Sequence, residues 1–328
     1  MEFIGVKIYD QWTTPYPSDK LAEATGSAED FNQPVSGRQE ALMRKFLLSA
    51  VYLAVFSVAG FSQPKGWNDP VPPFRIMDNL YYVGSKELAS FLFVTPQGDI
   101  LMNTGYETTV PVIKESVEKL GFKFTDVKIL IAGHAHPDHV GGDNMVKDLT
   151  GAQVVVGRLD AEKTKDFHPA GKEHPIDRLV DEGDTVSLGG TTLTAHVMPG
   201  HTRGCLAWST TLKENGKSYY TFVECSLNGQ FLQVLDNYPG MVDDFRATFK
   251  KARTFPVEVF LSSHASFFNM AEKYEKLQKR GPGDPNPFVD PEGYKAHVDQ
   301  YEKSFEAALA RRDAGGGAAG GPGPGRGR

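Results

Sequence analysis

The stretch "GHAHPDHVGG", residues 133–142, contains three histidines and one aspartate between His134 and His139. Imidazole is the commonest neutral zinc ligand in proteins, and carboxylate is a second good ligand. Within one loop, His134 and His136 can point to one side while Asp138 and His139 point to another. This arrangement suits two adjacent metal ions better than one, so we expect a metal site here.

An apolar run leads directly into this cluster. Residues 127–133, "VKILIAG", are rich in β-branched side chains and predict a buried strand that ends where the histidines begin. Loops at strand ends present chemical groups on a rigid scaffold. Two later histidines have the same position, because His201 follows the strand-like residues 191–200 and His264 follows residues 257–263. We expect both to join the ligand set.

The middle of the chain, residues 60–313, is predicted to form one domain without internal repeats. Strand-like and helix-like runs follow one another there, which indicates sheets covered by helices. The expected strands are residues 74–84, 90–103, 127–133, 152–157, 191–200, 205–212, 218–225 and 257–263, and the expected helices are 109–121, 241–255 and 291–313. Residues 314–328 form a Gly/Pro-rich tail that we expect to be disordered, because it cannot bury enough apolar surface to offset its ordering entropy.

Residues 43–59 have the three parts of a secretory signal peptide. Arg44 and Lys45 precede an apolar run that ends in small residues suited to cleavage. A buried helix is the alternative, whereas a membrane span would need about 20 apolar residues. Residues 1–42 are then an upstream extension, either disordered or the product of a mis-assigned translation start. We expect a periplasmic or secreted protein with no membrane segment in its mature form.

Composition narrows the possible functions. The 328 residues are 40% hydrophobic and 23% charged, as in soluble globular proteins, and the net charge of −6 gives no reason to expect nucleic acid as a partner. With only two cysteines, neither a disulfide-rich scaffold nor a cysteine-built zinc finger is available.

Six side chains together resemble the ligand pattern of the metallo-β-lactamase superfamily: His134, His136, Asp138, His139, His201 and His264. The resemblance implies an α/β fold, the αββα sandwich of two mixed β-sheets flanked by helices, with the metal site along one edge. It also implies two Zn²⁺ ions per chain. His134, His136 and His201 would bind one zinc ion. Asp138, His139 and His264 would bind the other.

The pattern looks most like subclass B3 of the metallo-β-lactamases. Where another subclass has a cysteine ligand, this chain has Ser226, and residues 176–190, 194–202 and 286–294 resemble B3 segments closely. There are two departures. Arg203 stands where proline is frequent, and Asn103 replaces a common aspartate. Neither is expected to bind metal, but Asn103 lies behind the metal ligands, and we expect it to support them less well than aspartate would.

The resemblance implies a zinc-dependent hydrolase that opens the amide bond of β-lactam rings through a metal-bound hydroxide and so confers antibiotic resistance. Asp138 would be the catalytic carboxylate that orients the hydroxide. Ser226 and Asn228 would bind the carboxylate of the small-molecule β-lactam, although ordinary turn hydrogen bonds would also explain them. The alternative is a lactonase or a glyoxalase-type thioester hydrolase. Those enzymes use a bridging aspartate near residues 225–226, where this chain has none. The oligomeric state is left open.

The remaining cysteines and histidines are expected to have structural roles. A hairpin turn at Asn215-Gly216 would bring Cys205 roughly opposite Cys225. Free buried thiols are the expected state, with a disulfide or a metal-binding Cys225 as alternatives. Four histidines are left without a metal: His168 and His174 in a loop bordering the groove, His196 packed beside the site, and His297 exposed on the last helix.

Overall fold

The apolar strands that precede the histidines belong to two sheets. A computed structural model describes residues 64–165, 171–229 and 238–313, so the predicted extension, signal peptide and Gly/Pro tail lie outside the described residues. The first sheet has seven strands in sequence order: β1 (Phe74–Met77), β2 (Leu80–Tyr82), β3 (Phe91–Phe93), β4 (Asp99–Met102), β5 (Val127–Ile131), β6 (Gln153–Gly157) and β7 (Arg178–Val180). It is mixed, because β1 to β4 pair antiparallel and β4 to β7 pair parallel.

Two runs predicted as single strands are hairpins instead. The run 74–84 divides into β1 and β2 because Asp78 turns the chain in the left-handed region, with φ of 50°. The run 90–103 divides into β3 and β4 around Gly98, whose φ is 115°. Alternation along a run predicts strands well but does not show where one short strand ends and the next begins.

The second sheet has five strands, in the order β12-β11-β10-β9-β8. Their bounds are β8 (Thr185–Leu188), β9 (Thr191–Val197), β10 (Leu206–Glu214), β11 (Lys217–Glu224) and β12 (Val259–Ser262). The predicted hairpin at Asn215-Gly216 is confirmed, because both residues have positive φ and Glu214 pairs with Lys217. In this sheet β11 and β12 pair parallel and the other neighbours antiparallel, so it is also mixed.

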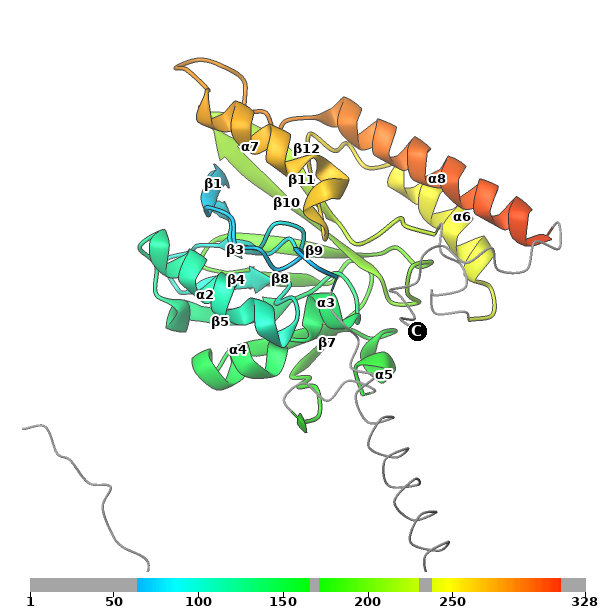
Figure 1. Cartoon of the computed structure of the whole chain (residues 1–328), viewed down its shortest axis with the longest axis horizontal. Helices are drawn as coiled ribbons and strands as arrows, with labels where there is room; N and C mark the ends of the chain where they lie inside the picture. The colour runs from blue at the N-terminus through cyan, green and yellow to red at the C-terminus, as the bar shows by residue number, and fades with distance from the viewer. Residues whose placement is uncertain (1–63, 166–170, 230–237, 314–328) are drawn as a thin grey trace, which may run out of the picture. The chain divides into compact units, whose positions relative to one another are not determined.

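Helices cover the outer face of each sheet, and the αββα sandwich is confirmed (Figure 1). The longer helices are α2 (Val110–Lys119), α4 (Asp143–Thr150), α6 (Met241–Ala252), α7 (Met270–Gln278) and α8 (Pro291–Asp313). The apolar face of α2, with Ile113 and Val117, packs with Leu101 and Leu130 of the first sheet. A larger core lies between the sheets and under α6 and α8. No helix among the described residues is both long and apolar enough to cross a membrane.

Candidate metal centre

Loops that follow four strands meet at one edge of the sandwich. The loop after β5 carries the histidine cluster, the loop after β9 carries His201, the loop after β11 carries Ser226, and the loop after β12 carries His264. The backbone of the histidine cluster continues into α3 (Pro137–Val140), for which His136 is the N-cap residue. Residues far apart in the sequence therefore converge there, as the strand-end positions predict.

The first triad consists of His134, His136 and His201, whose ligand atoms all lie within 4.8 Å of one another. The ring centroids are 4.6 to 4.9 Å apart. Burial, together with the charges of neighbouring histidines, lowers the pKa of His134 well below its ordinary value and that of His201 to about 3. Both rings are therefore neutral at pH 7, which is the form that binds a metal ion.

Asn228 fixes the orientation of His201 within this triad. Nδ1 of His201 lies 3.0 Å from the carbonyl oxygen of Asn228, to which it donates when protonated there. Such a contact selects the tautomer whose Nε2 carries the free lone pair. That lone pair is then available for a metal ion.

The second triad consists of Asp138, His139 and His264, and it contains the only carboxylate in the two triads. Oδ2 of Asp138 lies 3.4 Å from Nε2 of His139 and 3.5 Å from Nε2 of His264. Burial raises the pKa of Asp138, but the neighbouring histidines outweigh it, so the net pKa falls below its ordinary value. Asp138 is therefore ionised at neutral pH.

Glu87, which sequence reasoning missed, faces the other side of His264. Oε1 of Glu87 lies 3.5 Å from Nδ1 of His264 and accepts a hydrogen bond of 2.6 Å from the hydroxyl of Ser266. Burial lowers the pKa of His264, but Asp138 and Glu87 outweigh this effect and raise it to about 9. A backbone bridge between Leu88 and His264 keeps the two segments together.

Buried ring nitrogens test whether these residues suit a metal ion. Among the described residues, Nε2 of His134 and both ring nitrogens of His139 are buried without a hydrogen-bond partner. An unpartnered buried polar atom costs free energy unless a ligand satisfies it. Imidazole nitrogens together with one carboxylate are also a donor set that zinc prefers. The residues of both triads therefore fit metal ions.

Asn103 supports the histidine loop through both atoms of its side-chain amide. Its side-chain oxygen accepts a hydrogen bond of 3.2 Å from the backbone N–H of Gly133, and its amide nitrogen donates one of 3.2 Å to the carbonyl of Ala89. An ionised aspartate could accept the first bond but could not donate the second. Asn103 also has a φ of 61°, a conformation that asparagine tolerates better than most residues.

The predicted substrate residues lie beside the first triad. Ser226 is 3% exposed, and its hydroxyl accepts a hydrogen bond of 3.3 Å from the backbone N–H of Asn228. The hydroxyl proton of Ser226 is still available for donation in that contact. Asn228 contacts His201 through its backbone carbonyl, as described above. The structure thus gives both residues a turn contact and places them next to a candidate ligand.

The expectation of free thiols is wrong, because Cys205 and Cys225 form a disulfide with Cα atoms 5.9 Å apart. The hairpin at residues 215–216 places the two cysteines opposite each other, as predicted, but their sulfurs are bonded and not free. The two sulfurs and His134 form a third group with metal-like spacing. Sulfurs bonded to each other offer no thiolate, so Cys225 is not a metal ligand in this state.

The other histidines lie away from the triads where the structure describes them. His174 is buried, with Nε2 2.9 Å from a carboxylate oxygen of Asp143. His196 contacts the hydroxyl of Ser209 and the ring of Phe255. His297 was expected to be exposed but is 6% exposed, because its ring packs against aromatic side chains of the second sheet and α8. His168 lies outside the described residues.

Comparisons with known proteins agree with this architecture. Residues 89–212 match the metallo-β-lactamase superfamily. The structure is similar to the native metallo-β-lactamase from Legionella gormanii, with a TM-score of 0.69 and 41% identity over 75% of this chain and 98% of that one. It is also similar to a subclass B3 metallo-β-lactamase of Bradyrhizobium japonicum, with a TM-score of 0.71 and 37% identity over 76% of this chain and 98% of that one.

Curated relatives include a different activity. A hydroxyacylglutathione hydrolase from Hyphomonas neptunium is 41% identical over 75 residues, which are 23% of this chain and 26% of that protein. A probable metallo-hydrolase from Burkholderia pseudomallei is 30% identical over 26% of this chain and 32% of its own length. The matched segments thus span about a quarter to a third of these relatives.

Proposed function

Because the chain belongs to the metallo-β-lactamase superfamily, we propose that this hydrolase is a zinc-dependent β-lactamase of the B3 type that opens the β-lactam amide bond. One observation carries the proposal: two solved metallo-β-lactamases are 41% and 37% identical to this chain, and each match covers 98% of the solved protein's length. The likeness to hydroxyacylglutathione hydrolase, by contrast, covers 26% of that protein. Hydrolysis of the ring would give resistance to β-lactam antibiotics, and activity against them would take place in the periplasm or outside the cell.

In this proposal each triad holds one zinc ion, and the chain positions the substrate between them. Zinc would supply a Lewis acid and make hydroxide available near neutral pH. Asp138 is ionised, so its second carboxylate oxygen can accept a hydrogen bond from the attacking water and orient it. This role makes Asp138 the proposed catalytic residue.

Ser226 and Asn228 would anchor the substrate carboxylate beside the first triad. The hydroxyl of Ser226 keeps its proton for donation, and Asn228 follows in the same turn. The net contribution of one hydrogen bond is typically about 0.5–1.5 kcal/mol. The low exposure of Ser226 favours a supporting role over a dominant one.

A thioester hydrolase is the second candidate, favoured by the curated relatives. Such enzymes have a bridging aspartate near residues 225–226, and the nearest acid in this chain is Glu224. Glu224 is 2% exposed, and its carboxylate accepts a hydrogen bond of 2.6 Å from the hydroxyl of Ser262. It belongs to none of the possible ligand groups among the described residues. The second triad therefore lacks the acid that this activity would require.

Substrate hydrolysis by the purified, zinc-loaded protein distinguishes the two candidates. We expect turnover of a penicillin, a cephalosporin or a carbapenem that stops when a chelator removes zinc. S-lactoylglutathione and a homoserine lactone are tested in the same way, as substrates of the alternative thioester hydrolase and lactonase activities. Efficient turnover of either one with β-lactams left intact would contradict the proposal, although the fold and the metal centre would stand.

A further inference from the structure

The carboxylate of Asp160 joins the two loops that carry the first triad. Asp160 follows β6 and precedes the short helix α5 (Ala161–Thr164). Its Oδ2 accepts a hydrogen bond of 2.9 Å from the backbone N–H of Ala135, the residue between His134 and His136. The same oxygen accepts one of 2.8 Å from the hydroxyl of Thr202, the residue after His201.

The second oxygen of Asp160 completes the contact with the His201 loop. Oδ1 accepts a hydrogen bond of 2.7 Å from the backbone N–H of Gly204. A side chain at position 204 would place its Cβ 2.4 Å from the backbone nitrogen of Asp160, so only glycine allows this approach. Both oxygens of one carboxylate are therefore bonded to segments that carry all three histidines of the first triad.

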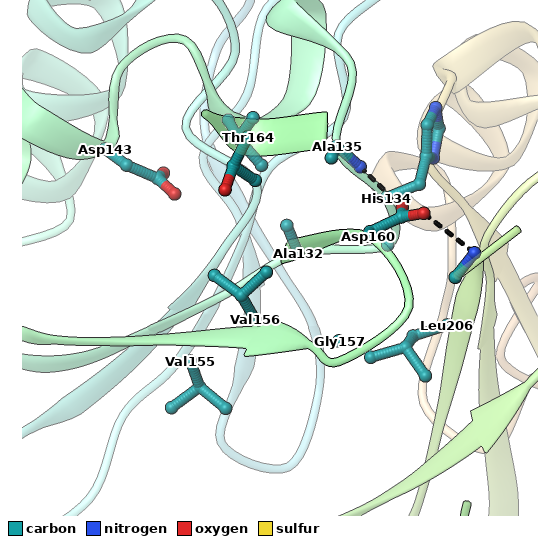
Figure 2. A pocket seen from close by; sticks show the side chains of 13 residues that line it. Ala132, His134, Ala135, Asp143, Val155, Val156, Gly157, Asp160, Thr164 and Leu206 are labelled. Carbon is teal, nitrogen blue, oxygen red and sulfur yellow. Dashed lines mark hydrogen bonds between the residues drawn. The ribbon is translucent and has the colours of Figure 1, made fainter. Parts of the chain in front are cut away.

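Asp160 itself is held in place and shielded from solvent. Its backbone N–H donates to the carbonyl of Gly157, and its own carbonyl accepts from the N–H groups of Lys163 and Thr164. The side chain is 2% exposed and lies at the edge of a cavity of about 10 Å³ (Figure 2). A cavity of that size accommodates about one water molecule. Asp160 has no room to touch a substrate and can act only through the residues it binds.

We propose that Asp160 is a positioning residue that preorganises the first triad for its metal ion. This inference rests on the proposal that His134, His136 and His201 bind zinc. Three hydrogen bonds converge on this one carboxylate, and they fix the spacing between the two ligand loops before an ion arrives. Among the described residues, none of the side-chain hydrogen bonds of Asp160 joins it to a residue of the second triad.

The experiment measures zinc affinity in two backgrounds that each retain one triad. His264→Ala leaves the first triad complete, and His201→Ala leaves the second complete. Asp160→Asn keeps the size but replaces one acceptor oxygen with a donor amide. We expect it to weaken zinc binding about ten- to hundredfold in the His264→Ala background and to change it little in the His201→Ala background. Competition with a chromophoric chelator gives the affinities, and the cobalt absorption bands of the first triad should change in parallel.

Two further variants keep the test decisive. Asp99→Asn changes another carboxylate that is 3% exposed, at the start of β4, and should leave both zinc affinities unchanged. If Asp160→Asn does not fold, Thr202→Val removes one of the three bonds and should give a smaller loss, below about tenfold, in the first triad alone.

An unchanged first-triad affinity, or an equal loss in both backgrounds, would overturn the role of Asp160. This failure is separate from failure of the proposed function, because a protein that binds zinc normally but leaves β-lactams intact would still test Asp160. Absence of zinc binding by the His264→Ala protein would overturn the inference together with the metal site.

Discussion

The first triad and the second triad are in contact, since the rings of His134 and His139 lie 4.3 Å apart, yet their charges are balanced differently. The first triad has three histidines and depends on a carboxylate behind the backbone, Asp160. The second triad has its own carboxylate, Asp138, and a further acid, Glu87, beside His264. Without metal, His134 and His201 of the first triad are neutral rings, whereas the second triad contains an ion pair between Asp138 and His264.

The two triads therefore differ in how the protein arranges the ligands before a metal ion binds. Hydrogen bonds to backbone N–H groups fix where the ligands of the first triad lie without changing which atoms face the ion. Charged partners in the second triad interact with the ligands directly and compete with the metal for them. We therefore expect geometry to control the affinity of the first site and protons to control that of the second.

The largest expected effect comes from Asp138→Asn, which removes the charge of the second triad. We expect kcat for β-lactam hydrolysis to fall a hundredfold or more, because a positioned acid–base group is lost. Steady-state kinetics under zinc excess measures it. If kcat stays within about tenfold of the wild-type value with both zinc ions bound, Asp138 is only a ligand.

The second prediction concerns pH. The pKa of His264 is raised to about 9, so below that pH zinc must displace a proton from this ring, and affinity should fall about tenfold per pH unit. Between pH 8 and pH 6 the second site should weaken about a hundredfold. His134 and His201, whose pKa values are lowered, the latter to about 3, have no proton to lose in that range, so these two ligands add no pH dependence to the first site.

Zinc titrations at the two pH values measure how the affinity of each site depends on pH. The His264→Ala protein reports on the first site and the His201→Ala protein on the second. Equal slopes for the two sites would contradict the comparison. A steeper slope for the first triad would reverse it.

A third prediction is that Glu87→Gln lowers second-site zinc affinity roughly tenfold above pH 9, because a negative charge beside His264 is removed. Near pH 6 the difference should shrink, since Glu87 also raises the pKa of His264 and its loss weakens the competing proton. Glu118→Gln, an exposed acid on α2, is the matched control. A loss of affinity that does not depend on pH would show that Glu87 acts only through packing.

The smallest expected effect is that of Ser226→Ala, which changes neither triad. Loss of a hydrogen bond to the substrate carboxylate should raise KM about fivefold and leave kcat nearly unchanged. Measurements with an intact and a decarboxylated substrate check the assignment. An equal effect on both substrates would mean that Ser226 supports the turn through Asn228 and does not bind the carboxylate.

The two clusters of candidate ligands were predictable because their side chains carry the chemistry and follow apolar strands. His201 and His264 could be placed beside the histidine cluster from their strand-end positions alone. Asp160 could not, because its partners are mainly backbone N–H groups, which leave no trace in the residue types of Ala135 or Gly204. The one available signal was an aspartate between a strand and a helix, which by itself predicts no more than a helix N-terminus.

Burial and pairing were harder to predict than position. His297 lies on a helix whose charged residues suggest exposure, and only the packed structure shows its contact with Phe260. The hairpin at residues 215–216 followed from local turn preferences, so the approach of Cys205 to Cys225 was predictable, but the bond between them depends on sulfur geometry that the sequence does not specify.

Metal analysis of the dialysed protein tests the central claim, that two unequal sites lie side by side. We predict two zinc ions per chain in the wild-type protein at pH 8, and one in the His264→Ala protein, which keeps the first triad. A wild-type stoichiometry that stays at one under zinc excess would contradict the account.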